Sequence, residues 1–413
     1  MTELPLEGVR ILDLTGMLAG PYATRLLADM GAETIKVESL RRYDLTRGPV
    51  AGDARARIYP DEDPGDSPTD RSSYYNEMNR NKLGITLDLQ TDRGREIFLR
   101  LVAESDVVIE NFSAGVLERL GLAYETLCGT KADIIVVSMP AFGNSGPWRN
   151  GVAYGNTMEA LSGFAAVNGY PDSLPITTSF TYGDPVAGVH AAFALLAAIE
   201  YRDRTGEGQF VDLSQLETLV QFIGESVLDY SMNARLPERT GGRDSSRAPD
   251  GVYRCHGDDN WVSISGMDDE GWLALSGLIG RGDLRDVSAS ERLERRDELD
   301  EAVEAWTSTL DRVDAMIALQ SAGIAAAAVL DAPGIAADAQ VAERGYLEEI
   351  SHPQAGTHSY PGLPWRMSGI DRTIRMPAPT LGEHNGRVFG ELLGMSEGEL
   401  ATLAEEGVAG TKP

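Results

Sequence analysis

The sequence predicts an α/β protein, with a large doubly wound domain built on a parallel sheet and a smaller α+β domain. Apolar strand and helix patterns alternate from residue 9 to residue 138, which is typical of a parallel sheet covered by helices. Composition shifts near residue 235, where a linker-like stretch precedes a hairpin pattern and a run of charged helices. At 413 residues, the chain is long enough for two domains.

A βαβ unit opens the chain. Val9–Leu14 is predicted to form a buried strand, Tyr22–Met30 a helix that ends at Gly31, and Glu33–Glu38 the next strand. In an open α/β sheet, the bend after the first strand is where a nucleotide binds. The bend over 15–21 lacks the pattern G-x-G-x-x-G, so it carries no dinucleotide fingerprint.

The next elements continue the alternation. In chain order they are a long loop over 41–75, a strand over 85–89, a helix over 91–104, strands over 106–110 and 132–138, a long apolar helix from Asp184 to a stop at Gly206, and a short strand over 209–212. Ser214 and Glu217 then have the spacing of a capping box ahead of another apolar helix.

The second domain is predicted from a hairpin, with strands over 252–255 and 261–265, followed by charged helices through residue 322. A strand over 325–330 and an amphipathic helix over 388–393 come later. We therefore assign the large domain to 1–225 completed by 330–413, and the small domain to 235–325. Residues 326–413 are expected to return to the large domain.

Charge and composition exclude several classes. The formal net charge of −28 argues against a nucleic-acid partner, because phosphates repel an acidic surface. No apolar run reaches the roughly 18 residues of a membrane span, and the first residues lack a secretory signal, so a cytoplasmic protein without a membrane partner is expected. Cys128, Cys255 and five scattered histidines have no metal-ligand spacing, so no metal site is predicted.

Asp184 lies between a glycine and Pro185, directly ahead of a long apolar helix. Proline favours the first helical position, which predicts Asp184 as the N-cap. The partial positive charge at a helix N-terminus is expected to keep its carboxylate ionised.

In the helix that follows, Ala187, Gly188 and Ala191 keep the first turns thin, so a ligand or another backbone can approach. The apolar face behind Asp184 is expected to consist of Val189, Phe193 and Leu196. A capping role alone would also explain this aspartate.

Several stretches, in order over nearly the whole chain, together resemble family III CoA-transferases, the group that includes formyl-CoA transferase, carnitine CoA-transferases and α-methylacyl-CoA racemases. These stretches span 6–14, 19–21, 31–38, 44–48, 79–82, 87–89, 108–112, 117–121, 183–184, 202–209 and 381–384. The resemblance implies a Rossmann-like large domain and an interlocked homodimer. It also implies that the substrates are an acyl-CoA thioester and a carboxylic acid, with no permanently bound cofactor.

The resemblance further implies that Asp184 is a covalent nucleophile that carries first the acyl group and then CoA. The positions that it assigns to CoA binding are Leu18, Ala19, Arg42, Leu87, Asp88, Asn111, Phe112, Arg119, Tyr154 and Gly155. Arg119 is the best candidate for a phosphate contact, because a guanidinium forks onto phosphate oxygens. A family arginine is Ser39 here, so Arg41 or Arg42 is expected to replace it.

Three functions stay open. A CoA-transferase is favoured over a racemase or isomerase because Tyr154 stands where the racemase branch has a histidine, and a phenol of pKa ~10 is a poor base at neutral pH. The third alternative is a non-catalytic subunit of a heteromeric transferase, against which an intact Asp184 argues. In formyl-CoA transferase, which this chain resembles, a glycine-rich loop of the small domain covers the intermediate. The comparable region here, 241–251, is not a glycine run. Arg243 or Arg247 in this region could bind an acceptor carboxylate.

Overall fold

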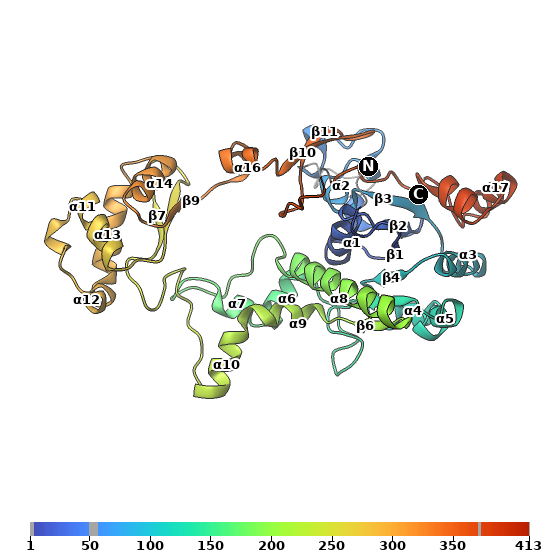
Figure 1. Ribbon diagram of the computed structural model, residues 1–413, viewed down its shortest axis with the longest axis horizontal. Coiled ribbons are helices and arrows are strands. Elements are labelled where there is room, and N and C mark those ends of the chain that lie inside the picture. Colours follow the sequence, from blue (N-terminus) through green and yellow to red (C-terminus); the bar gives the residue numbers. More distant parts are fainter. Residues whose placement is uncertain (1–3, 49–56, 371–372, 413) are drawn as a thin grey trace. The chain divides into compact units, whose positions relative to one another are not determined.

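The computed structural model describes residues 4–48, 57–370 and 373–412. The chain forms two compact units (Figure 1). The larger unit comprises Met1–Phe164, Thr178–Gly224 and Glu343–Pro413, and the smaller unit comprises Ala165–Thr177 and Glu225–Ala342. Among the described residues, no helix combines the length and apolar character needed to cross a membrane.

The larger unit is built on a six-stranded parallel sheet, which confirms the predicted fold class. Its strands are β1 (Arg10–Asp13), β2 (Glu33–Glu38), β3 (Lys82–Thr86), β4 (Val107–Glu110), β5 (Ile135–Ser138) and β6 (Phe210–Asp212), in the order β3-β2-β1-β4-β5-β6. Leu12 of β1 lies opposite Ile35 on one side and Val108 on the other. The strand order reverses between β1 and β4, and in such sheets the crevice beyond the carboxyl ends of these two strands holds the ligand.

Both faces of this sheet are covered, because neighbouring strand residues point to opposite sides. Ile11 and Val107 belong to a core with α1 (Ala19–Asp29) and α8 (Gly183–Thr205). Leu12 and Val108 face the other core, with residues from α3, α5, α17 and a π-helical segment. The other helices of the larger unit are α2 (Ser73–Asn79), α3 (Asp92–Ala103), α4 (Val116–Arg119), α5 (Tyr124–Thr130), α6 (Gly155–Leu161), α9 (Gln215–Val220), the π-helix (Gly386–Leu392) and α17 (Glu397–Glu405).

Antiparallel pairs complete the structure. In the smaller unit, β7 (Gly251–Arg254), β8 (Trp261–Ile264) and β9 (Ala326–Ala328) form one sheet, and Trp272 lies in its core. After the smaller unit, the chain returns to the larger unit at Glu343. The α-helices of the smaller unit are α10 (Gly224–Asn233), α11 (Asp269–Leu278), α12 (Ala289–Glu294), α13 (Arg296–Thr307), α14 (Arg312–Ser321) and α15 (Ala332–Ala336). Two of the four boundaries between the units fall in α7 (Phe164–Val167) and α16 (Ala339–Glu343). The larger unit adds the hairpin of β10 (Leu347–His352) and β11 (Gly356–Pro361).

Two predicted elements are displaced. The strand expected over 85–89 occupies Lys82–Thr86 instead, because Lys82 is buried in an ion pair with Asp13 while the apolar residues after β3 are buried beyond the strand. The first helix begins at Ala19 rather than Tyr22, since the Tyr22 N–H already donates to the Leu18 carbonyl (2.8 Å). The loop expected over 41–75 contains short 3-10 turns at Leu45–Arg47, Pro60–Glu62 and Pro68–Asp70, and residues 49–56 lie outside the described residues.

Candidate active site

Asp184 lies in the first turn of α8, but it is not the N-cap. The helix begins at Gly183 with Tyr182 as the N-cap, and the Asp184 N–H donates to the Thr181 carbonyl (2.9 Å). Thr181 adopts a left-handed conformation (φ 46), which turns the chain into the helix earlier than the proline signal predicts. The predicted capping role of Asp184 is therefore wrong, and its side chain is available for other contacts.

Three segments meet at the Asp184 carboxylate. The Thr181 side chain and the Ala19 backbone N–H make polar interactions with it. Ala19 is the first residue of α1, so its N–H has no partner within that helix. Gly155 lies on another side, where an added Cβ would be only 2.3 Å from Asp184 Oδ2. The structure thus brings three predicted site residues together, at the N-terminus of an 11-residue helix that favours negative charge.

The carboxyl group of Asp184 is harder to ionise than an ordinary aspartate. Burial raises its pKa to about 6, and the negative charge of Glu159 acts in the same direction. The interactions with Thr181 and Ala19 oppose this shift. The local sequence does not reveal this shift, because burial depends on how α1 and α8 pack. A carboxylate with a pKa near 6 is still mostly ionised at neutral pH, and such a raised pKa is a feature of functional sites.

Glu159 supports the segment that leads into α8. Its carboxylate is fully buried and accepts hydrogen bonds from the Thr178 N–H (2.6 Å), the Thr178 hydroxyl (2.7 Å) and the Tyr182 N–H (2.8 Å). Sequence reasoning missed this support and the contact made by Thr181. The available signal was a glutamate between Met158 and the apolar pair Ala160-Leu161, because a charged side chain that is buried among apolar residues requires partners.

The buried face of α8 differs from the predicted one. Val189, Phe193 and Leu196 are 50%, 74% and 43% exposed. The face that packs against the sheet and α1 consists mainly of small residues, with Ala187, Ala191, Ala192, Leu195 and Ala198 in the core. An added Cβ on Gly188 would lie 2.7 Å from the Ala19 carbonyl oxygen, so the small residues allow α1 to approach closely. This approach brings Ala19 to Asp184.

The turn between β1 and α1 is tied to the end of β4. Asn111 accepts a hydrogen bond from the Gly16 N–H and donates one to the Gly16 carbonyl, both at 2.8 Å. Leu18 follows as the N-cap of α1. Leu18, Ala19 and Asn111 therefore form one connected region at the point where the strand order reverses. Phe112 packs partly against the core on the α3 side.

The remaining predicted positions lie in other segments, apart from Tyr154, which directly precedes Gly155. Leu87 and Asp88 are buried just after β3, which β2 separates from β1. Arg41 Nε lies 3.6 Å from Asp88 Oδ2, and both Arg41 and Arg42 are exposed. Arg119 is exposed at the end of α4, and Tyr154, the N-cap of α6, is 63% exposed. These side chains follow the carboxyl edge of the sheet or the surface near it.

The sequence matches the family described as CoA-transferase family III over residues 6–385. It is 31% identical to the succinyl-CoA–D-citramalate CoA-transferase of Chloroflexus aurantiacus, over 97% of this chain and 96% of that protein. It is also 31% identical to the formyl-CoA:oxalate CoA-transferase of Streptomyces avermitilis, over 98% of this chain and 99% of that protein. Among solved structures, a CAIB/BAIF family protein from Brucella suis superposes with a TM-score of 0.83 and 31% identity, over 95% of this chain and 100% of that one.

Proposed function

This chain belongs to CoA-transferase family III, and from that premise we propose that it moves CoA from an acyl-CoA thioester to a carboxylic acid through a covalent intermediate on Asp184. The observation that carries the proposal is the position of the Asp184 carboxylate, half-buried against Gly155 and beside the Ala19 N–H, which has no partner within α1. A carboxylate held there is available as a nucleophile, and the N–H can stabilise an oxyanion that develops next to it.

The first half of the proposed reaction unloads the donor. An Asp184 oxygen attacks the thioester carbonyl, and the C–S bond breaks to release CoA as a thiolate, leaving a mixed anhydride. The thiolate then attacks the side-chain carbonyl of Asp184. The donor acid leaves as a carboxylate, and Asp184 carries CoA as a thioester.

The second half loads the acceptor by the same steps in reverse. The acceptor carboxylate attacks the aspartyl thioester and displaces the CoA thiolate, which gives a second anhydride. The thiolate attacks the acceptor's carbonyl, so the new acyl-CoA forms and the Asp184 carboxylate is restored. No proton is gained or lost over the cycle, and no permanently bound cofactor is required. Water must be excluded, because anhydride and thioester both hydrolyse.

For CoA itself, we propose that the turn at Leu18 and Ala19 faces the reactive end, together with Tyr154 and Gly155. Asn111 and Phe112 border the same crevice at the end of β4. Leu87, Asp88, Arg41 or Arg42 and Arg119 are proposed for the nucleotide portion. Their spread along the carboxyl edge of the sheet supports this assignment, because a CoA molecule is long and such edges bind nucleotides.

The covalent intermediate gives the direct test. Incubating the protein with an acyl-CoA and hydroxylamine is expected to convert Asp184 into a hydroxamate, because hydroxylamine attacks both the anhydride and the aspartyl thioester. Peptide mass spectrometry locates the modification. Protein without acyl-CoA is the control, and a hydroxamate at another carboxyl group, or none during turnover, would contradict the mechanism.

The activity is expected to fall in acid. Only the ionised carboxylate is nucleophilic, so kcat/KM should rise with pH through an apparent pKa of about 6 and level off above it. The profile is measured between about pH 5 and pH 8 with a donor whose own groups do not titrate there. A flat profile over this range would show that ionisation of Asp184 does not limit the reaction.

The names of the similar transferases suggest which class of acid accepts CoA. The two transferases compared above are named for the donors succinyl-CoA and formyl-CoA and for the acceptors D-citramalate and oxalate, and both acceptors are dicarboxylates. We propose a dicarboxylate acceptor for this chain. A panel of acyl-CoA donors against mono- and dicarboxylic acids, followed by mass spectrometry of the CoA esters, identifies the pair.

A racemase on the same scaffold would need a second acid/base group facing Asp184. The carboxylate of Glu159 is occupied by three hydrogen bonds, and His190 Nδ1 lies 2.9 Å from the Val186 carbonyl of its own helix. These contacts favour transfer. Exchange of the α-proton of an acyl-CoA with deuterated solvent, in the absence of an acceptor acid, would favour the racemase instead.

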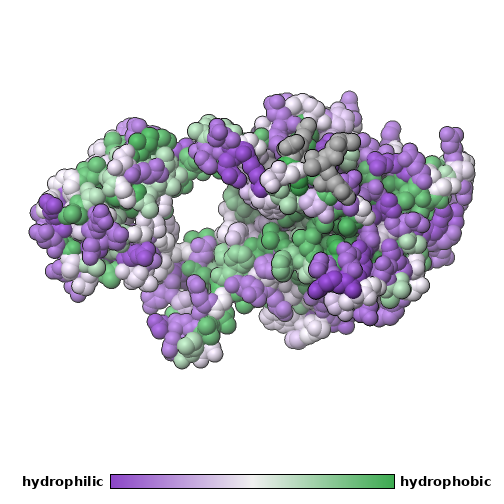
Figure 2. Space-filling view, viewed as in Figure 1, coloured by the Kyte–Doolittle hydropathy of each residue, from purple (hydrophilic) through white to green (hydrophobic). Residues whose placement is uncertain are grey.

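We propose that the active form is an interlocked homodimer in the cytoplasm. The exposed apolar residues of α8 support a partner on that helix, and Figure 2 shows further apolar residues at the surface of the larger unit. The variant Phe193→Glu is expected to shift the protein from dimer to monomer in light scattering, because a charge would be buried in the interface. Glu200→Gln, an exposed change on the same helix, is the control. A wild-type protein that is monomeric at micromolar concentration would contradict the proposal.

A further inference from the structure

The turn between β1 and α1 is held by side chains from three other segments. Asn111 binds both backbone groups of Gly16, as described above. On the other side, Asp44 Oδ1 accepts the Met17 N–H (3.1 Å), and Lys36 Nζ donates to the Thr15 carbonyl. Met17 has a left-handed backbone (φ 64), a conformation that a non-glycine residue adopts only when its surroundings hold it there.

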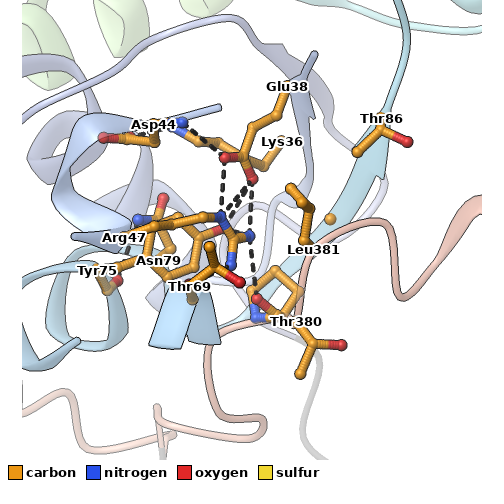
Figure 3. Close-up of polar contacts among 12 residues, drawn as sticks. Lys36, Glu38, Asp44, Arg47, Thr69, Tyr75, Asn79, Thr86, Thr380 and Leu381 are labelled. Carbon is orange, nitrogen blue, oxygen red and sulfur yellow. Dashed lines mark hydrogen bonds and ion pairs between the residues drawn. The ribbon is translucent and has the colours of Figure 1, made fainter. Parts of the chain in front are cut away.

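Asp44 is itself fixed by buried charges. Lys36 Nζ lies 2.9 Å from Asp44 Oδ2, and the Asp44 N–H donates to Glu38 Oε1 at 2.9 Å. The guanidinium of Arg47 forms a two-pronged contact with Glu38, through Nε at 2.9 Å and Nη2 at 2.8 Å (Figure 3). All four side chains are buried, and their two positive and two negative charges balance. Such a matched set keeps its geometry because removing one partner leaves a buried charge unpaired.

This cluster is connected to the nucleophile through the turn. Met17 is followed by Leu18, the N-cap of α1, and then by Ala19, whose N–H interacts with the Asp184 carboxylate. The Ala19 N–H therefore lies only two residues along the chain from the Met17 N–H that Asp44 holds. Asp44 Oδ1, which accepts the Met17 N–H, also accepts the N–H and the hydroxyl of Thr46, so three donors fix this oxygen.

We propose that Asp44 is a positioning residue for the reaction: by holding the Met17 N–H, it fixes the β1–α1 turn so that the Ala19 N–H meets the Asp184 carboxylate. This inference rests on the proposed function of Asp184. It gives a function to the buried Lys36–Asp44 ion pair. Stability alone does not require this pair, because a well-packed apolar pair can replace a buried ion pair without loss of stability.

The test is the variant Asp44→Asn, which keeps the size of the side chain but has one oxygen in place of two. That single oxygen cannot accept both the Lys36 ammonium and the Met17 N–H, which bind different oxygens of Asp44. We expect kcat to fall about 10- to 100-fold, because an oxyanion donor that is out of place loses much of its effect. We also expect the part of the kcat/KM profile that rises with pH, the acid limb, to move to higher pH, because the Ala19 N–H normally lowers the pKa of Asp184.

The direction of this pH shift separates positioning from charge. Removing a negative charge, or leaving Lys36 unpaired, would by electrostatics alone lower the pKa of Asp184 and move the limb to lower pH. The other charged group acting on the Asp184 carboxylate is Glu159, on α6, and the variant does not touch it. A limb that moves upward therefore reports a displaced N–H.

The control is Asp29→Asn. Asp29 is a fully buried carboxylate that pairs with Arg80 (2.7 Å) at the other end of α1. Removing its charge should destabilise the protein about as much as Asp44→Asn does, but it leaves the β1–α1 turn unchanged. It should lower the melting temperature and leave the acid limb in place. Should Asp44→Asn not fold, Asn111→Ala releases the same turn from its other side and is expected to move the limb upward too.

The inference is overturned if the folded Asp44→Asn or Asn111→Ala protein keeps kcat within about twofold of wild type, or if its acid limb is unmoved or lower. The variant Asp184→Asn separates this failure from failure of the proposed function. If that variant is inactive while Asp44→Asn behaves as wild type, only the positioning role is lost. If Asp184→Asn is active, the proposed mechanism is lost as well.

Discussion

Replacing Asp184 with asparagine is expected to reduce CoA transfer by about 10⁴-fold or more while the protein stays folded. A carboxamide has nearly the same shape as a carboxylate, but it cannot form the anhydride. Glu159 is the nearby carboxylate that acts on Asp184, and its hydrogen bonds to Thr178 and Tyr182 keep it from taking over. Initial rates of acyl-CoA formation, measured by chromatography, give the comparison.

The same variant is expected to be more stable than wild type at neutral pH. A carboxyl group whose pKa is raised on folding, here to about 6, favours the folded state at low pH, and this contribution is lost as the pH rises through 6. Asparagine does not titrate, so the free energy of unfolding should increase by about 1–2 kcal/mol above pH 7 and change little near pH 4. Urea denaturation at both pH values tests this.

Asp92→Asn is the matched control, because Asp92 also lies in the first turn of a helix but has a fully exposed side chain. It should keep wild-type activity and show no such stabilisation. Turnover of Asp184→Asn within about tenfold of wild type would remove the covalent mechanism. A variant that is both inactive and less stable at neutral pH would mean that Asp184 is structural.

Much of the larger unit could be predicted because its strands are short apolar runs between clear turn signals. β2 spans the predicted residues, and the helix expected over 91–104 is α3, which Thr91 caps by accepting the Gly94 N–H (2.9 Å). These features depend on a few neighbouring residues. Local patterns therefore sufficed to predict that the sheet is parallel and covered on both faces.

The face of α8 could not be predicted, because hydrophobic periodicity follows large side chains. In α8 the large residues Val189 and Phe193 are exposed, and Ala187 and Ala191 are buried where α1 comes close. A stripe of small residues indicates a close helix contact only when the second helix is known. The displacement of β3 has a similar origin, since the burial of Lys82 depends on Asp13 across the sheet.

The order of motifs was enough to single out Asp184, Ala19 and Gly155, but their mutual contacts come from tertiary packing. The rise in the pKa of Asp184 was not predicted for this reason: the helix N-terminus is visible in the sequence, whereas burial is not. The roles of Thr181 and Glu159 depend on a left-handed residue and a buried loop contact. Neither has a distinct local signature.

Gly155→Ala is expected to lower kcat/KM by about 100-fold or more, because the added methyl group occupies the space of the nucleophile. Its Cβ would lie 2.3 Å from Asp184 Oδ2, 2.5 Å from Thr181 Cβ and 3.1 Å from Thr181 Cα. The backbone of Thr181 cannot yield cheaply, since it is already left-handed, so the carboxylate must turn away from the Ala19 N–H. Steady-state kinetics with a fixed donor measure the loss.

Gly224→Ala is the matched control, because it adds the same methyl group at a helical glycine with nothing within 4 Å of the new Cβ. It should leave kcat/KM unchanged and raise stability by up to about 1 kcal/mol, as alanine favours helix over glycine. Gly155→Ala should instead lose about 1–3 kcal/mol through overpacking. If Gly155→Ala keeps wild-type kcat/KM, the reactive carboxylate does not lie against Gly155. The attack on the thioester would then start from a different side-chain conformation of Asp184, in which the Ala19 N–H has no part.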